Sequence, residues 1–257
     1  MKIKIFAVNA FVGENCRGNL AGVCIPPQDI SDEELQKLAT EFNASETGFI
    51  FPQEKNFLIR WFSPTQEVDL CGHATLACAS WIWSNGYSQT DEIIFKSRSG
   101  QLRCVKAADQ MIEMEFPELP VSQAESEKGL LEALAIDNTV FVGKSENYFL
   151  IEVKDEEVLQ ALSPNFQLMS ELKTLGVFVT CKSSKLKYDF VSRCFFPKEG
   201  IPEDPATGSA HCSLGPYWRD KLLKNTLCAW QSSKLGGEIK IIFRDSKLIL
   251  SGRTTFE

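Results

Sequence analysis

The chain is organised around the stretch Pro202-Glu203-Asp204-Pro205-Ala206-Thr207-Gly208-Ser209-Ala210-His211. Two carboxylates and a proline that ends extended chain come first, and the small residues after them predict a helix over about 207–222. The first turn of a helix has unpaired N–H groups and a partial positive charge, so anions bind there readily. The stretch therefore predicts an anion-binding site or, as the alternative, an acidic turn that caps an ordinary helix.

The first half of the chain contains a counterpart of this stretch. Residues 69–75 read Asp-Leu-Cys-Gly-His-Ala-Thr, and residues 74–84 are apolar nearly all round. A helix that is apolar on every face must be enclosed by other structure. In both halves, strands lead to a helix that opens with glycine and polar residues. If the halves pack face to face, two helix N-termini would clamp a small carboxylate-bearing substrate.

The hydrophobic pattern predicts the remaining elements and one domain boundary. Ser31-Asp32-Glu33-Glu34 is a capping box, and the apolar spacing behind it predicts an amphipathic helix over 31–42. Pro117-Glu118-Leu119-Pro120 predicts a boundary between an N-terminal domain, 1–117, and a C-terminal domain, 118–257. Strands are predicted near 3–8, 18–23, 49–51, 57–62, 92–97, 101–107, 111–116, 147–153, 176–181, 188–196, 226–231, 237–243 and 247–251, and helices over 124–135 and 155–162.

Composition restricts the class of function. A chain of 257 residues with 44% hydrophobic and 24% charged residues is ordinary for a soluble globular protein, and a net charge of -7 argues against nucleic acid as a main partner. No apolar run approaches the roughly 20 residues of a membrane span. The alternating run over residues 1–6 is too short for a signal peptide. We therefore expect a cytoplasmic protein without a membrane partner.

Cysteine and histidine usage argues against a metal site. The nine cysteines form no Cys-x-x-Cys pair, and free thiols are predicted. The two histidines, His73 and His211, leave little for a zinc site. A site built from His73, Asp204 and His211 has too few assured ligands, so no metal is expected.

Five short motifs in order along the chain resemble the PhzF family, named for phenazine biosynthesis, within the diaminopimelate-epimerase-like superfamily. They are Asn9-Ala10-Phe11, Gly18-Asn19, Asn43-Ala44-Ser45-Glu46-Thr47, Cys71-Gly72-His73-Ala74-Thr75 and Glu203-Asp204-Pro205-Ala206-Thr207-Gly208-Ser209-Ala210. The resemblance implies an α+β fold of two pseudo-twofold-related domains, each a β-barrel-like sheet wrapped around a central helix. It also implies an active site between the domains and a homodimer. A final strand that crosses back to the first domain is expected to be short or absent here.

The resemblance also assigns roles to the matching residues. Glu46 matches the general acid/base, and His73, Asp204 and Ser209 match the other polar residues of the active site. A carboxylate at the mouth of an apolar strand should have a raised pKa and serve as a base, while His73 at a helix N-terminus should be neutral. Glu203 is left without a role. The residues expected to contact the substrate are Asn19, Cys71, Gly72, Thr207 and Gly208.

The expected activity is a PhzF-like isomerisation without a cofactor. Protein dipoles aimed at a carbanion next to a carbonyl can stabilise it alone, so neither a metal nor an organic cofactor is needed. The reaction would be a proton transfer, as a double-bond shift or an epimerisation, on a small carboxylate-bearing substrate. The substrate itself cannot be deduced from the sequence.

The alternatives differ in the residues they need. The amino-acid epimerases of the superfamily use two cysteines, but here Thr207 takes the second position, and a hydroxyl is too weak an acid to replace a thiol. Cys71 is interpreted mainly as a small residue at a tight turn. A serine hydrolase using Ser209 and His211 is not favoured, because residues two apart on a helix point to different faces and no Gly-x-Ser-x-Gly is present. A non-catalytic binding or interaction protein remains the second hypothesis.

Overall fold

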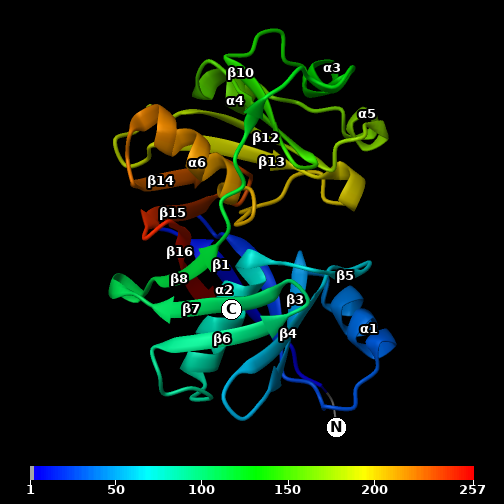
Figure 1. The fold of residues 1–257 in the computed structure, drawn as a ribbon. Helices are drawn as coiled ribbons and strands as arrows, with labels where there is room; N and C mark the ends of the chain where they lie inside the picture. The colour runs from blue at the N-terminus through cyan, green and yellow to red at the C-terminus, as the bar shows by residue number, and fades with distance from the viewer. Residues whose placement is uncertain (1–2) are drawn as a thin grey trace. The chain divides into compact units, whose positions relative to one another are not determined.

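The computed structural model describes residues 3–257, which divide into two compact units (Figure 1). Unit 1 runs to Phe116 and also includes Ile249–Glu257, and unit 2 is Pro117–Leu248. The boundary expected after residue 117 falls beside this division. The end of the chain differs from expectation, because residues 249–257 belong to unit 1 rather than to the C-terminal domain.

Unit 1 is a closed barrel of eight strands with one short strand beside it. Its ring order is β1-β2-β3-β4-β6-β7-β8-β16, and β16 pairs back onto β1, with Ala10 opposite Thr254. The final strand therefore does return, in contrast to the short or absent crossing that was expected. The physical reason is that β1 and β8 would otherwise leave open sheet edges. The strands are β1 (Phe6–Val12), β2 (Asn19–Cys24), β3 (Glu46–Pro52), β4 (Phe57–Phe62), β5 (Glu67–Val68), β6 (Glu92–Ser97), β7 (Gly100–Lys106), β8 (Ile112–Phe116) and β16 (Lys247–Phe256), with β5 paired to β4.

The apolar helix predicted over 74–84 is α2 (Gly72–Ser84), and it lies inside the barrel. It contacts β1, β2, β3 and β8, and its residues 72–82 are all buried. Close approach to the strands depends on small residues. A Cβ atom at Gly48 of β3 would collide with Cys78 Sγ of α2. The predicted enclosure of this helix is thus confirmed.

Helix α1 (Asp32–Phe42) packs against β3 and β4 of the same unit. Its predicted capping box is confirmed, since Ser31 Oγ accepts from the Glu34 amide at 3.2 Å and the Glu34 side chain reaches back to the Ser31 amide. Leu35 and Ala39 form its buried stripe. The pattern of apolar residues thus predicted both the helix and its buried face.

Unit 2 contains a sheet of seven strands in the order β15-β14-β13-β12-β11-β10-β9. Helix α6 packs along β14, and Trp218 Nε1 donates to Thr180 Oγ1 of β12 at 3.0 Å. The strands are β9 (Ser122–Gln123), β10 (Phe141–Ser145), β11 (Tyr148–Glu152), β12 (Gly176–Lys182), β13 (Phe190–Phe195), β14 (Thr226–Gln231) and β15 (Gly237–Arg244). The helices are α3 (Leu130–Leu134), α4 (Glu156–Ala161), α5 (Phe166–Glu171) and α6 (His211–Leu222), with 3₁₀ turns η1 (Ala108–Gln110) in unit 1 and η2 (Pro197–Glu199) here.

Two predicted helices of unit 2 are shorter than expected. The helix predicted over 124–135 is wrong in extent, because Gly129 and Ala135 take left-handed conformations with φ of 88° and 55° and confine α3 to 130–134. The helix predicted from about 207 begins at His211. A tight turn precedes it, with the His211 amide bonded to Gly208 O at 3.0 Å. Strands β9 and β10 and helix α5 were not predicted.

The structure also bears on the cysteines and on membrane-spanning helices, two features considered from the composition. All nine cysteines are free, as predicted, and seven of them are buried. Among residues 3–257, no helix combines the length and the apolar character needed to cross a membrane.

Candidate functional site

The first two motifs form a strained corner that positions Asn19. Phe11 has a φ of 59° at a bulge in the pairing of β1 with β16, an unusual backbone for a bulky side chain. Gly18 has a φ of 69°, and a Cβ atom there would collide with the Ala10 carbonyl oxygen. Only glycine therefore fits before β2. The corner sets Asn19 opposite Ala10 and leaves its side chain fully buried.

The imidazole of His73 is the centre of a polar cluster in unit 1. Its Nε2 lies 3.3 Å from Glu46 Oε2, where β3 begins. Its Nδ1 lies 3.4 Å from Asn19 Nδ2 and 3.5 Å from Cys71 Sγ. Ser45 Oγ donates to Asn19 Oδ1 at 2.8 Å. Strands β2 and β3 pair in parallel and both begin at this cluster, so their N-terminal residues lie together at the start of α2.

His73 is neutral in this setting. Burial lowers its pKa from 6.5 to about 3, because the charged ring would lose its hydration. Burial, rather than the helix N-terminus on which the expectation rested, therefore favours the neutral ring, and a neutral ring does not form an ion pair with Glu46. Nε2 is buried, yet its contact with Glu46 lacks the alignment of a hydrogen bond, and it has no hydrogen-bond partner among residues 3–257.

The first amides of α2 lie beside the same ring. The intrahelical bonds begin with the Thr75 amide, which donates to Cys71 O at 3.2 Å. The preceding amides of Gly72, His73 and Ala74 donate to no acceptor within the described chain. These donors and the positive end of the helix favour an anionic group next to Glu46 and His73.

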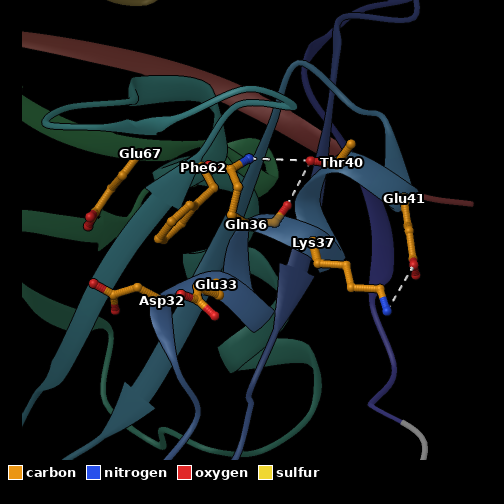
Figure 2. A pocket seen from close by; sticks show the side chains of 8 residues that line it. All are labelled: Asp32, Glu33, Gln36, Lys37, Thr40, Glu41, Phe62 and Glu67. Carbon is orange, nitrogen blue, oxygen red and sulfur yellow. Dashed lines mark hydrogen bonds and ion pairs between the residues drawn. The ribbon is translucent and has the colours of Figure 1, made fainter.

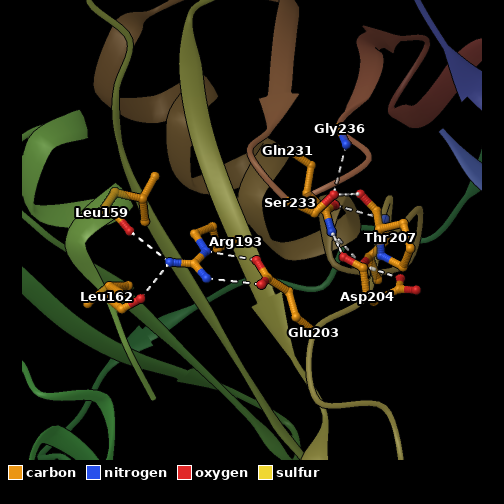
Figure 3. Close-up of polar contacts among 10 residues, drawn as sticks. Leu159, Leu162, Arg193, Glu203, Asp204, Thr207, Gln231, Ser233 and Gly236 are labelled. Carbon is orange, nitrogen blue, oxygen red and sulfur yellow. Dashed lines mark hydrogen bonds and ion pairs between the residues drawn. The ribbon is translucent and has the colours of Figure 1, made fainter. Parts of the chain in front are cut away.

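In unit 2, the Asp204–Thr207 segment is fixed by a glutamine at the end of β14 (Figure 3). Gln231 Oε1 accepts from the Thr207 amide at 2.8 Å, and Gln231 Nε2 donates to Asp204 O at 2.7 Å. Thr207 Oγ1 donates to Asp204 Oδ2 at 2.5 Å. The Asp204 amide donates to Cys194 O of β13 at 3.0 Å. The hydroxyl of Thr207, which takes the position of the second cysteine of the epimerases, therefore donates its proton to Asp204.

Glu203, which had no expected role, anchors the same segment. Its carboxylate accepts two bonds from Arg193, from Nε at 2.7 Å and from Nη2 at 2.9 Å (Figure 3). Arg193 Nη1 also donates to the carbonyls of Leu159 and Leu162 at 3.2 and 3.0 Å. The guanidinium thus ties the segment before Asp204 to β13 and to the end of α4.

Ser209 and His211 are placed differently. Ser209 is exposed in the turn before α6, and the amides of Gly208, Ser209 and Ala210 have no acceptor among residues 3–257. His211 is fully buried, its Nδ1 lies 2.7 Å from Thr207 O, and burial lowers its pKa to about 4. One side chain is exposed and the other is bonded inside the fold, which agrees with the rejection of a serine hydrolase.

A metal ion does not suit the cluster in unit 1. One ligand atom from each of Glu46, Cys71 and His73 can be chosen so that all lie within 4.8 Å. However, Glu46 lies at Nε2 and Cys71 at Nδ1, on opposite edges of the ring. One ion binds one ring nitrogen, so the observed arrangement fits a chain of proton donors and acceptors better than a common metal.

A surface hollow on unit 1 is separate from these residues. It has a volume of about 780 Å³ and lies between α1 and the strands β4 and β5 (Figure 2). Its lining residues are Asp32, Glu33, Gln36, Lys37, Thr40, Glu41, Phe62 and Glu67. None of them is a predicted site residue, and Lys37 and Glu41 form an exposed ion pair across one helical turn.

The predicted site residues therefore form two clusters. The first cluster, in unit 1, comprises Asn19, Glu46, Cys71, Gly72 and His73; the second, in unit 2, comprises Asp204, Thr207, Gly208 and Ser209. Sequence reasoning missed the roles of Ser45, Arg193 and Gln231. Ser45 stood inside a quoted motif, whereas nothing near Gln231 marks it as a partner of residues more than 20 positions earlier.

A family model of phenazine biosynthesis-like proteins, PhzC-PhzF, matches residues 8–255 of the chain. The chain belongs to the PhzC-PhzF family. It is 43% identical over 255 residues to an uncharacterized isomerase of Halalkalibacterium halodurans, covering 98% of this chain and 96% of that protein. A crystal structure of a PhzF-family protein from Enterococcus faecalis has a TM-score of 0.91 and 34% identity, covering 100% and 97% of the two chains.

The PhzC-PhzF fold extends to more distant proteins. A probable proline racemase from Agrobacterium radiobacter, with bound carbonate, has a TM-score of 0.67 at 11% identity and covers 100% of this chain and 91% of its own. At that identity the likeness concerns the fold alone. The closed barrel around α2 and these neighbours confirm the predicted diaminopimelate-epimerase-like fold.

Proposed function

We propose that this PhzC-PhzF protein is an isomerase that moves a proton on a small carboxylate-bearing substrate without a cofactor. The observation that carries the proposal is the 3.3 Å contact of Glu46 Oε2 with the buried His73 Nε2, which has no hydrogen-bond partner among residues 3–257 and lies beside the first amides of α2. A base, a neutral hydrogen-bond donor and an anion-binding helix end are the parts that such a reaction needs.

In the proposed reaction, Glu46 is the base. A carboxylate oxygen of Glu46 takes the proton from a substrate carbon beside a carbonyl or carboxylate group, and the C–H electron pair moves into that group. The negative charge grows on the substrate oxygen, where amides of Gly72 and His73 would donate to it. Glu46 then returns the proton to another carbon, which shifts a double bond, or a second donor protonates the opposite face, which inverts the centre.

The second cluster is proposed to bind the rest of the substrate. Asp204 carries a carboxylate that suits an ammonium or hydroxyl group, and Ser209 offers an exposed hydroxyl at a turn whose three amides have no acceptor in the described part of the chain. Asn19, Cys71, Thr207 and Gly208 are proposed as substrate contacts or supports. That the two clusters serve one substrate stays a prediction.

The relatives support the class of reaction. The Halalkalibacterium halodurans protein is named an isomerase, and the distant neighbour with the same fold is named a probable proline racemase. Both names fit a proton transfer at carbon, and neither defines the substrate of this chain.

Hydrogen exchange in deuterated water tests the proposal. A panel of cyclic and acyclic amino acids and unsaturated carboxylic acids is incubated with the protein, and proton NMR follows the loss of C–H signals. For any acid that exchanges, Glu46→Gln should lower the rate by about 10²–10⁴-fold, the usual contribution of a general base. Binding of the acid, measured by calorimetry, should remain.

The matched control is Glu54→Gln, an exposed glutamate in the loop after β3, which should leave exchange unchanged. A non-catalytic binding protein, the second candidate, would bind an acid equally well with and without the Glu46→Gln substitution and exchange none of its protons. Exchange that survives Glu46→Gln at the native rate would remove Glu46 as the base.

A further inference from the structure

The two ring nitrogens of His73 face groups of opposite character. Asn19 Nδ2, 3.4 Å from Nδ1, can only donate a hydrogen bond. Glu46 Oε2, 3.3 Å from Nε2, is a carboxylate oxygen, and an ionised carboxylate can only accept. A neutral imidazole has one protonated nitrogen and one with a lone pair. The neighbours therefore require the lone pair on Nδ1 and the proton on Nε2.

The orientation of the Asn19 amide is set by Ser45. Ser45 Oγ donates to Asn19 Oδ1 at 2.8 Å, and this oxygen is the sole acceptor of the Ser45 hydroxyl among residues 3–257. With Oδ1 facing Ser45, Asn19 Nδ2 is directed at the imidazole. A reversed amide would take that acceptor from the Ser45 hydroxyl. With the amide reversed, Asn19 Oδ1 would face the His73 ring and require the proton on Nδ1. The lone pair on His73 Nε2 would then face the Glu46 carboxylate, so that two hydrogen-bond acceptors would be in contact.

We propose that Ser45 and Asn19 are positioning residues that hold His73 in its neutral Nε2–H tautomer. What this means for catalysis rests on the proposed function: His73 then acts as a hydrogen-bond donor to the substrate oxygen, and Glu46 alone is the base. The buried Nε2–H has no aligned acceptor within the described chain, so it is available to that oxygen. A fixed donor needs no reorientation when charge develops.

The same tautomer assigns a state to Cys71. Cys71 Sγ lies 3.5 Å from Nδ1, which carries the lone pair in this arrangement. A thiol can donate to a lone pair, whereas a thiolate would be repelled by it. This tautomer therefore favours the thiol form of Cys71 over the thiolate.

The second histidine provides an internal reference with the opposite tautomer. His211 Nδ1 lies 2.7 Å from the carbonyl oxygen of Thr207, which only accepts, so the proton of His211 is on Nδ1. With two histidines in the chain, each tautomer should be represented by a single set of signals.

Long-range ¹H–¹⁵N correlation spectra of the uniformly ¹⁵N-labelled protein read out the tautomers directly, since protonated and unprotonated ring nitrogens have well-separated shifts. We expect one Nε2–H ring, which disappears in His73→Gln, and one Nδ1–H ring from His211. A wild-type His73 that is protonated on Nδ1 overturns the proposal.

Two variants test the residues that hold the tautomer. Asn19→Asp replaces the donor by an acceptor of the same shape and should place a proton on Nδ1 of His73. Ser45→Ala, at a partly exposed position, should release the amide and give mixed His73 signals, and Ser45→Thr, which restores the hydroxyl, should return the Nε2–H pattern. An unchanged His73 pattern in Ser45→Ala or in a folded Asn19→Asp overturns the role of that residue.

The control variant is Ser97→Ala, a partly buried serine whose hydroxyl bonds to a hairpin turn at Gly100 O. It should leave both rings unchanged, and His211 should stay Nδ1–H in every variant, which shows that the fold is intact. These spectra need no substrate. If the tautomers are as expected and no acid exchanges, the proposed function fails while the positioning role stands. With an exchanging acid, Asn19→Asp should lower kcat by up to about 10⁴-fold, as a wrong tautomer does at a catalytic histidine.

Discussion

At the scale of single residues, the two histidines are both buried as neutral rings. Burial lowers the pKa of His73 to about 3 and that of His211 to about 4, from 6.5 for a solvated imidazole. Each ring is therefore uncharged in the folded chain at neutral pH. For His73 this makes the ring a donor rather than a cation, and for His211 it makes the ring a support for the Thr207 carbonyl.

The same burial predicts a pH-dependent stability. Below pH 6.5 the unfolded chain protonates its histidines while the folded chain does not, so the free energy of unfolding falls as the pH falls toward the folded pKa values. Each histidine should contribute a slope of about 1.4 kcal/mol per pH unit in this range. Urea unfolding is measured at about pH 7.5, 6 and 5, which covers the titration of histidine in the unfolded chain. The free energy of unfolding should fall less steeply with falling pH in His211→Gln than in the native chain. Equal slopes would contradict the neutral buried state of His211.

At the scale of elements, the fit of α2 inside the barrel depends on close contact with β3. A Cβ atom at Gly48 has no room because Cys78 Sγ occupies that space. We expect Gly48→Ala to lower the free energy of unfolding by about 1–3 kcal/mol through overpacking. Removing the sulfur in Gly48→Ala/Cys78→Ala should recover part of that loss. Additive effects of the two changes in urea unfolding would show that the contact is not the cause.

The ion pair of Glu203 with Arg193 is the second element-scale feature with a testable consequence. Both side chains are largely buried, at 21% and 13% exposed, and the pair holds the segment that carries Asp204. Glu203→Gln should cost about 1–3 kcal/mol of stability, because Arg193 loses a charged partner in a mostly buried place. It should also slow hydrogen exchange of any substrate found for the chain. Glu125→Gln, at an exposed position, is the control for both readouts. Full exchange activity in Glu203→Gln would show that the pair does not position Asp204.

At the scale of the whole molecule, the last strand completes unit 1 rather than unit 2. Residues 249–257 belong to unit 1, where Val8 pairs with Phe256 and Ser80 Oγ of α2 lies 2.6 Å from Thr254 Oγ1. Asn9 Nδ2 also donates to Glu257 Oε1 at 2.9 Å. A barrel closed in this way has no free edge in β1 or β8.

Removal of residues 249–257 should therefore destabilise unit 1 selectively. Amide hydrogen exchange by mass spectrometry should show lost protection in β1, β8 and α2 and greater aggregation, because two strand edges are exposed. Unit 2 should retain more of its protection. Native protection in β1 after the truncation would contradict this account. The homodimer implied by the family resemblance stays a separate prediction.

Much of the fold could be predicted because its signals are local. The capping box at Ser31 specified α1, and the apolar run after Cys71 specified an enclosed helix. The site residues could be proposed because the motifs that contain them resemble those of the PhzF family, and three of these motifs adjoin the start of β2, β3 or α2. These features arise from spacings of a few residues, in which side chain and backbone interact directly.

The tertiary structure alone decided the features that join distant parts of the chain. Gln231 fixes Thr207 across 24 positions, and Asn9 meets Glu257 across 248. The tautomer of His73 likewise depends on Asn19, at the start of β2, and on Ser45, which precedes β3 and acts through Asn19. The sequence by itself determined most of the strands, α1, the enclosed helix α2 and the motifs that carry the proposed site residues. Strand pairing and chain closure determined their partners, because no local spacing encodes a contact between residues so far apart.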